Sequence, residues 1–296
     1  MDIGYLPLSQ RTPDSQYSNR LHQILTEGQL AGNLPQGQNA LTCFGTLAPM
    51  VFDLRNGVPL ITERSCKGFW RTAVAEIIAF INGARTLQQF REFGCAKFWD
   101  AYEGRGVSLG LDPDDMGPGS YGPSFHDFPV PGGSTLNQFQ QLLEQILQYP
   151  SLRTHLVTPW QPYFTARGPN RKVIVAPCHG WLHFRVLGCK LHMQMNQRSA
   201  DFPIGVPSNM IQYAALLLMI CQVTGLQPGN FAHNFGDAHV YENQIEGVRT
   251  VLEREPRPFP VLRIDPGVTN LFDFRIHHFE LDEYDPHPGV KIPFAP

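Results

Sequence analysis

Cys178 and His179 stand side by side in the segment APCHG, directly after the apolar run 173–175. A cysteine in this position is either a small buried apolar residue or a nucleophile, and a nucleophile needs a nearby cation or helix N-terminus that favours the thiolate. Neighbouring side chains on a strand point to opposite faces, which argues against His179 as the base of a cysteine hydrolase. The segment itself leaves both interpretations of Cys178 open.

A second group of polar residues follows in the segment NQRSADFPIGVPSN (196–209). Arg198 could contact a phosphate and supply the cation that Cys178 needs. The Asn209 amide offers one acceptor and one donor, the complement of N3–H and O4 of a uracil ring, although helix capping alone would also explain it. His239 and Tyr241, on the same face of a predicted strand, could both bond a sugar hydroxyl. These side chains are of the types that a uracil nucleotide requires.

Glu76 lies in the segment AVAEIIAFI, where nearly all of its neighbours are apolar. A buried carboxylate without a partner is costly, and burial raises its pKa. The alternative is a position on the exposed face of an amphipathic helix. We expect Glu76 to be buried, with a raised pKa.

The composition is that of a globular protein with a sizeable core, since 42% of the 296 residues are hydrophobic and 17% are charged. A net charge of −3 gives no overall attraction to nucleic acid or acidic membranes, so we expect neither as a partner. The six cysteines show no metal-site or redox-pair spacing, and the N-terminus has no signal-peptide pattern. The longest apolar stretch, 210–223, is too short for a membrane span and carries two glutamines. We therefore expect a cytoplasmic protein with reduced cysteines and no metal.

Apolar periodicity and capping residues predict the elements that must position these side chains. The predicted helices are residues 15–30, 71–82, 86–94, 134–149, 208–225 and 242–254, and the predicted strands are 42–54, 155–160, 172–177, 180–188, 190–199 and 229–241. Residues 104–135, rich in Gly, Pro and Asp, are predicted to be loop. Helix 134–149 would be capped by Ser134 or Thr135, and helix 208–225 by Ser208 or Asn209. The second of these is apolar on almost every face, which predicts one α+β domain over residues 1–296 in which a sheet carries a central buried helix.

Taken together, these stretches resemble the thymidylate synthase family. The segments APCHG, QRSADFPIGVPSN, GDAHVYENQ, REPRPFPVL and YDPHPGVKIP follow the family's order, while DLRNGVPLIT, AEIIAFINGARTLQQF and FWDAY match its N-terminal half more loosely. The resemblance covers residues 20–296. It implies the thymidylate synthase α+β fold, with a mixed sheet, and a homodimer packed through that sheet with active sites that share residues across the interface.

The resemblance also implies a mechanism, in which the Cys178 thiolate adds to C6 of a pyrimidine nucleotide and makes C5 a nucleophile toward 5,10-methylenetetrahydrofolate. Catalytic roles would fall to Cys178, Glu76, Asn209, Tyr121 and Arg198. The nucleotide would be held by Arg198, Ser199, Asn209, His239, Tyr241 and, from the partner chain, Arg153. The folate would contact Trp99, Tyr102, Asp201, Gly205 and the C-terminal Pro296.

The sequence departs from the family pattern around the phosphate. The family's N-terminal phosphate loop carries an arginine, whereas nothing basic lies between Arg20 and Arg55, so that Gln36 or Gln38 would have to offer neutral hydrogen bonds. Where the family lends two successive arginines from the partner, this chain has Thr154 in the second place. Charged hydrogen bonds contribute roughly 1.5–3 kcal/mol each, so we expect weaker phosphate binding or a differently placed substrate.

The folate side departs as well, because ERSCKGFWR (63–71) is unlike the basic, histidine-bearing segment of the family, and Ser208 replaces a usual phenylalanine. Related hydroxymethylases let water, in place of hydride from tetrahydrofolate, capture the exocyclic methylene. Trp99 and the intact tail favour methylation of dUMP, Ser199 resembles the deoxynucleotide pattern, and Asn209 argues against cytosine. The alternatives are a 5-hydroxymethylase of deoxyuridylate or cytidylate and a nucleotide-binding homologue without turnover.

Overall fold

The computed structural model describes residues 3–32 and 37–294 of the chain. Gln36 and Pro296, both considered above, lie outside the described residues.

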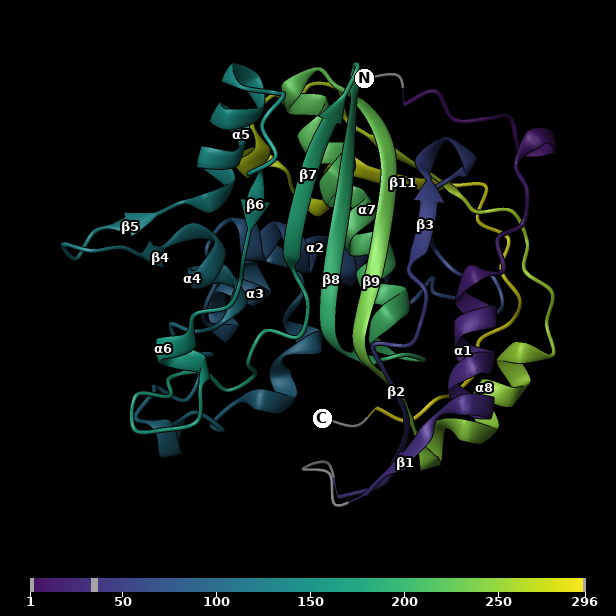
Figure 1. Ribbon diagram of the computed structural model, residues 1–296, viewed down its shortest axis with the longest axis horizontal. Helices are drawn as coiled ribbons and strands as arrows, with labels where there is room; N and C mark the ends of the chain where they lie inside the picture. The colour runs from purple at the N-terminus through teal and green to yellow at the C-terminus, as the bar shows by residue number, and fades with distance from the viewer. Residues whose placement is uncertain (1–2, 33–36, 295–296) are drawn as a thin grey trace.

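A mixed sheet forms the centre of the structure (Figure 1). Its strands run in the order β1-β2-β9-β8-β7-β6, and β3 also pairs with β9. The long strands β8 and β9 are parallel because helix α7 connects them, while the other pairs are antiparallel, so the predicted mixed sheet is confirmed. The strands are β1 (Gln29–Ala31), β2 (Ala40–Phe44), β3 (Met50–Asp53), β6 (Leu156–Val157), β7 (Trp181–Leu187), β8 (Lys190–Asp201) and β9 (Gln227–Tyr241).

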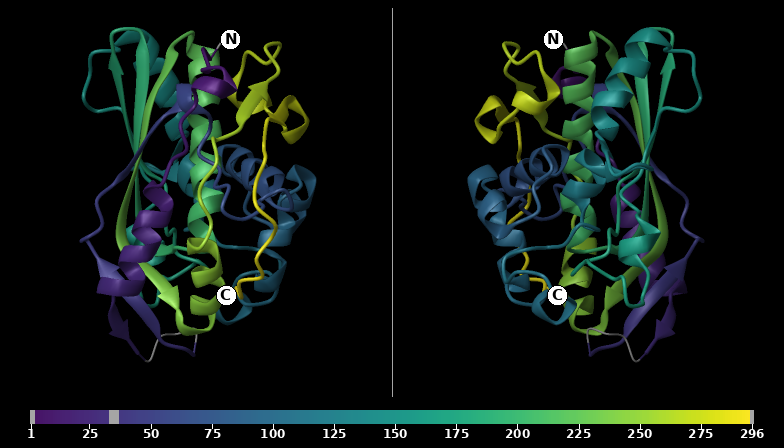
Figure 2. Two further views of the ribbon diagram at one scale, coloured as in Figure 1. Left: turned by 90° about the vertical axis from the view of Figure 1, so that its right-hand side faces the viewer. Right: turned by 90° about the vertical axis from the view of Figure 1, so that its left-hand side faces the viewer.

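Helix α7 (Gly205–Thr224) runs behind this sheet, where it contacts both long strands and α2 (Trp70–Ile81) (Figures 1 and 2). Its length and apolar composition would also suit a membrane span, but 83% of its apolar stretch is buried by the rest of the chain. A helix that is apolar all round belongs in the core of a large domain. The predicted central buried helix is confirmed.

The remaining elements surround the sheet and α7. Helix α1 (Gln16–Glu27) contacts α8 (Ile245–Leu252), and α2 contacts α3 (Leu87–Phe93) and α4 (Tyr121–His126). The others are α5 (Gln138–Gln148), α6 (Pro162–Thr165) and two hairpins, β4 (Phe128–Pro129) with β5 (Thr135–Leu136) and β10 (Val261–Ile264) with β11 (Phe279–Asp282). A hydrophobic cluster reaches from Ile3 to Phe279, through both halves of the chain.

Some predicted strands and loops were wrong. The predicted strand 42–54 is two strands, β2 and β3, because Gly45 turns the chain with a φ of 67° between them. Residues 172–177 form an irregular loop in place of the predicted strand. The predicted loop 104–135 contains α4 and the β4–β5 hairpin, which are too short to produce a periodic pattern.

Two predicted helix caps were also wrong. Helix α5 is capped by Asn137, whose side chain accepts hydrogen bonds from the backbone N–H groups of Phe139 and Gln140. Helix α7 begins at Gly205 after Ile204, so that Asn209 lies in its second turn and does not cap it. Pro207 fits the first turn because the backbone N–H groups there have no partner within the helix.

On one face of the sheet, none of the described helices lies in front of β7, β8 and β9 (Figure 1). A row of side chains that are exposed or half-buried crosses this open face, strand by strand: Val51, Ala232, Gln194, His183 and Leu156. The opposite face carries the buried partners of α7.

Candidate active site

Cys178 lies half-buried in the loop that leads into β7, and neighbouring elements hold this loop in place. Its backbone N–H donates to Tyr121 Oη at 2.7 Å, and its carbonyl accepts from the backbone N–H of Arg198 at 2.8 Å. Gly180 follows with a φ of 96°, and a Cβ there would lie 2.8 Å from Tyr213 Oη. The last residue of the CHG triplet must therefore be glycine for both conformational and steric reasons.

Arg198 places its guanidinium beside the thiol. Its Nη2 lies 3.6 Å from Cys178 Sγ, while Nε and Nη2 donate to the carbonyls of Pro177 and Ala176, each at 2.8 Å. The guanidinium also stacks on the ring of Trp160, 5.5 Å from its centroid. Burial raises the pKa of Cys178, and the Arg198 charge opposes this effect. The resting group is a thiol at neutral pH, with a cation placed to stabilise its thiolate.

His179 supports this loop and is not a base. Its Nδ1 lies 2.7 Å from Tyr213 Oη, and its ring stacks on Tyr121 with centroids 4.6 Å apart. Burial lowers the pKa of His179 to about 3, so the ring is neutral at physiological pH.

Glu76 projects from α2 into the core, with only 7% of its surface exposed. Trp99 Nε1 donates to Oε1 at 2.6 Å, and Gln212 Nε2 donates to Oε2 at 2.8 Å. Burial nevertheless raises the pKa of Glu76 to about 7, against the effect of both donors. The expectation of a buried carboxylate with a raised pKa is confirmed, and such a group can take up and release a proton near neutral pH.

Asn209 is joined to Glu76 by a chain of buried amides. Asn209 Nδ2 donates to Gln212 Oε1 at 3.0 Å, and Gln197 Nε2 donates to Asn209 Oδ1 at 3.1 Å. At the far end, Gln197 Oε1 lies 2.8 Å from His233 Nε2. We call Glu76, Gln212, Asn209 and Gln197 the amide relay. Neither Gln197 nor Gln212 was predicted from the sequence, although Gln212 is one of two glutamines that interrupt the apolar helix 208–225.

Asp201, His239 and Tyr241 come together where β8 and β9 end. The parallel register pairs Asp201 with His239, and the His239 and Tyr241 rings lie 5.0 Å apart. The charge of Asp201 and the Cys178 thiol both act on Tyr241, whose pKa burial raises to about 12. The structure thus brings these three residues to the same site as Cys178, Arg198 and Ser199.

A family model, thymidylate synthase, matches residues 15–296. The chain belongs to the thymidylate synthase family. Members of this family transfer one-carbon units to pyrimidine nucleotides, with methylenetetrahydrofolate as co-substrate. The fold described above, a mixed sheet with helices, is consistent with the family.

Of the residues that the sequence predicts to contact folate, Trp99 is bonded to Glu76 and Tyr102 packs against Trp99. Trp99 packs beside Tyr102 and Tyr121, with ring centroids 5.7 and 6.4 Å away, and it is more deeply buried than Tyr102. Gly205 opens α7 close to Asn209, since a Cβ there would lie 3.8 Å from Asn209 Oδ1. The rings of Trp99, Tyr102 and Tyr121 form an aromatic wall next to the Glu76 carboxylate. Such a wall suits a flat, hydrogen-bonding ring such as a pterin.

The C-terminal tail is joined to Asp201 through Gln244. The Gln244 Nε2 group donates to both Asp201 oxygens at 3.2 Å and to the carbonyl of Pro293 at 3.0 Å. Burial raises the pKa of Asp201 to about 6, while the Gln244 donor acts in the opposite direction. The role of Gln244 was not predicted from the sequence.

In the segment 63–71, which departs from the family pattern, the first two charged side chains bond to other parts of the protein. Glu63 accepts hydrogen bonds from Ser18 Oγ and Thr62 N, and Arg64 Nη2 donates to the carbonyl of Pro203. Both charged side chains are buried. Their hydrogen bonds are therefore made inside the protein.

Arg153 is exposed in the loop before β6, where its carbonyl lies 3.0 Å from His183 Nε2 on the open face of the sheet. Thr154 is also exposed, and Gln38 is half-buried before β2.

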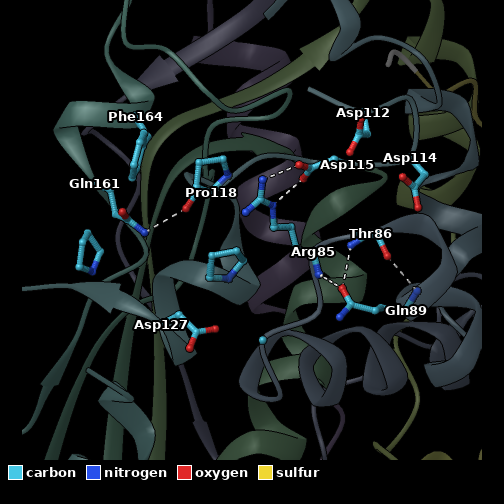
Figure 3. Close-up of a pocket in the computed structure, with 13 residues that line it drawn as sticks. Arg85, Thr86, Gln89, Asp112, Asp114, Asp115, Pro118, Asp127, Gln161 and Phe164 are labelled. Atoms are coloured by element: carbon cyan, nitrogen blue, oxygen red, sulfur yellow. Dashed lines mark hydrogen bonds and ion pairs between the residues drawn. The ribbon is translucent and has the colours of Figure 1, made fainter. Parts of the chain in front are cut away.

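A separate hollow of about 530 Å³ lies behind the loop that precedes Tyr121 (Figure 3). Arg85, in the turn after α2, points at the Asp115 carboxylate, and Asp112 and Asp114 lie nearby. Asp115 also accepts from the backbone N–H of Gly117 at 2.7 Å. This ion pair ties the turn after the Glu76 helix to the loop that positions Tyr121.

Proposed function

We propose that the protein methylates dUMP to dTMP, with 5,10-methylenetetrahydrofolate as the one-carbon donor. The observation that carries this proposal is the placement of Cys178 beside Arg198, with the amide relay and its raised-pKa carboxylate at the same site. Family membership supports one-carbon transfer to pyrimidine C5 in general, and Asn209 supports a uracil base.

The first step is attack by Cys178 Sγ on C6 of the uracil ring. Arg198 stabilises the thiolate that attacks, and Asn209 stabilises the negative charge that develops at O4. A phosphate bound at Arg198 would share a guanidinium that already holds the carbonyls of residues 176 and 177. Nucleotide binding and the position of the nucleophile are thereby connected through one side chain.

Glu76 is the group that moves protons in later steps. Its raised pKa lets it deliver a proton toward O4 and accept one that leaves C5, in each case through water. The folate supplies the carbon unit and, for methylation, the hydride. Trp99, Tyr102, Asp201 and Gly205 would hold it, and the tail anchored by Gln244 would exclude water from the exocyclic methylene.

A second candidate, a deoxyuridylate 5-hydroxymethylase, is favoured by the folate side of the site. Ser208 is a small, half-buried residue where the family has a phenylalanine, and the charges of Glu63 and Arg64 are turned inward. More room beside the methylene would admit the water that produces a hydroxymethyl group. Cytidylate is the less favoured substrate of this candidate.

Product mass distinguishes the two reactions. The protein is incubated with dUMP and methylenetetrahydrofolate while the absorbance of dihydrofolate is followed. We expect a methyl-sized gain with one dihydrofolate per product. A hydroxymethyl-sized gain without dihydrofolate would support the second candidate, and nucleotide binding without any product from dUMP, dCMP or CMP would indicate a homologue that only binds.

We also propose a cytoplasmic homodimer that packs through the open face of the sheet. Val51 and Leu156 are exposed on this face, which no described helix covers in front of the long strands, and family members are typically dimers. All six cysteines are free, as suits a reducing compartment.

Mixed dimers test the shared active site. Cys178→Ser and Arg153→Ala chains, each weakly active alone, should regain about a quarter of the wild-type sites when mixed, because half of random dimers are hybrids and each hybrid holds one intact site. The control mixes Cys178→Ser with the double variant, which can form no intact site. Equal activity in both mixtures would refute donation of Arg153 across the interface.

A further inference from the structure

Gln212 lies on α7 between the base-reading amide and the proton-transfer carboxylate, and it is completely buried. Both ends of its side chain are engaged, with Nε2 on the Glu76 carboxylate at 2.8 Å and Oε1 on Asn209 Nδ2 at 3.0 Å. A buried amide with a missing partner is costly, so this side chain is held in one orientation.

When Glu76 is ionised, it fixes the direction of the hydrogen bonds at its end of the relay. Trp99 Nε1–H is a donor only, and an ionised carboxylate is an acceptor only. Gln212 must therefore turn its nitrogen to Glu76 and its oxygen to Asn209. Asn209 in turn must present its nitrogen to Gln212.

The other end imposes the same direction independently. Gln197 Nε2 donates to the backbone carbonyl of Ser199 at 3.1 Å, and this carbonyl is an acceptor only. The same nitrogen donates to Asn209 Oδ1. Two neighbours thus assign which atom of the Asn209 amide is oxygen and which is nitrogen.

Each polar atom of Asn209 retains one bond for a ligand, an N–H on the Glu76 side and a lone pair on the Gln197 side. In the proposed function Glu76 serves O4 and C5, so C4 of the ring faces the Glu76 side. An oxygen at C4, as in uracil, accepts from this N–H. The amino group of a cytosine would instead set two donors against each other.

We propose that Gln212 is a positioning residue that determines base specificity, because it holds the Asn209 nitrogen where it meets an oxygen at C4 and repels an amino group. This inference rests on the proposed function. Without Gln212 the Asn209 amide is held by Gln197 alone, so turning its oxygen toward a cytosine costs one hydrogen bond fewer.

The test measures dissociation constants of dUMP and dCMP by calorimetry for the full-length protein and the variant Gln212→Met. We expect the preference for dUMP to fall about three- to tenfold, the size of one hydrogen bond. Gln222→Met is the matched control, because Gln222 lies on the same helix and its amide bonds the carbonyls of Asp265 and Val268 at 2.9 and 2.7 Å, outside the relay. This control should lose stability without a change in base preference.

The variant Gln212→Glu separates positioning from packing and remains informative if Gln212→Met does not fold. It keeps an oxygen acceptor for Asn209, so the dUMP preference should persist. It also places a carboxyl group against Glu76, so the break in the pH profile of kcat/KM should move to higher pH. The titratable groups on which the Glu76 charge acts are Cys95, Tyr102, Tyr121 and Tyr213. Burial raises the pKa of each, so they stay neutral near pH 7.

The outcomes are distinct. An unchanged dUMP preference in Gln212→Met, or a loss equal to that of Gln222→Met, would overturn the role of Gln212 while leaving the proposed function intact. A wild-type protein that binds neither nucleotide would overturn the proposed function and this inference with it.

Discussion

Replacement of Cys178 by serine should lower kcat for product formation by at least about 10³-fold, because loss of a covalent nucleophile is among the most severe single changes to an enzyme. A serine hydroxyl at this position is not ionised near neutral pH, even with Arg198 Nη2 beside it. Binding of dUMP should change little, because the Arg198 and Asn209 side chains keep their places. The measurement is dihydrofolate formation in steady state, together with covalent labelling by 5-fluoro-dUMP and folate.

The exposed Cys189 provides the matched control, since it lies in the turn between β7 and β8. Cys189→Ser should retain full activity and full labelling. Labelling that persists in Cys178→Ser and disappears in Cys189→Ser would show that Cys189 is the nucleophile and that Cys178 is not.

Glu76→Gln is expected to lower kcat by about 10²- to 10⁴-fold, the range for loss of a general acid–base group. In the wild type, kcat/KM should show a break near pH 7 that belongs to Glu76, apart from any break near pH 6 from Asp201. The variant should lack the break near pH 7. In Trp99→Phe the break should move to higher pH, because the carboxylate loses the donor at 2.6 Å.

The same substitution has a pH-dependent effect on stability. Burial raises the pKa of Glu76 from 4.5 to about 7, so between these values the folded state binds more protons than the unfolded state. The stability that the protonated carboxyl group contributes is fully present below pH 4.5 and is lost as the pH rises through 7. The advantage of wild type over Glu76→Gln in free energy of unfolding should therefore shrink by about 3 kcal/mol between pH 4.5 and pH 8. Denaturant unfolding at several pH values measures this, and a constant difference would mean that Glu76 does not titrate near 7.

The sequence predicted the residues whose roles depend on local context. The apolar neighbours of Glu76 indicated its burial, and the uniform apolar character of 208–225 indicated a central helix, because both features are determined by nearby side chains. The relay could not be predicted in this way. Gln197 and Gln212 belong to different elements, and only the packing of α7 on β8 shows that their amides meet Asn209.

The difference between local and distant contacts also explains two wrong predictions of local structure. The run 172–177 has the composition of a strand, yet it forms a loop held by Arg198 and Tyr121, which come from distant segments. Asn209 has the residue type of a cap, but the helix begins earlier, at Gly205, where Pro207 is accommodated in the first turn. Tertiary contacts override local propensity at both places.

The anchoring of the tail has a practical consequence for protein production. Pro293 is bonded through Gln244 to Asp201, so a polypeptide fused at the C-terminus would follow within a few residues of this anchor and of the region that we propose to bind folate. The described N-terminal segment begins at the top of Figure 1, whereas the described C-terminal segment ends in its lower half. An affinity tag at the N-terminus leaves that region clear, whereas one at the C-terminus needs to be removed before activity is measured.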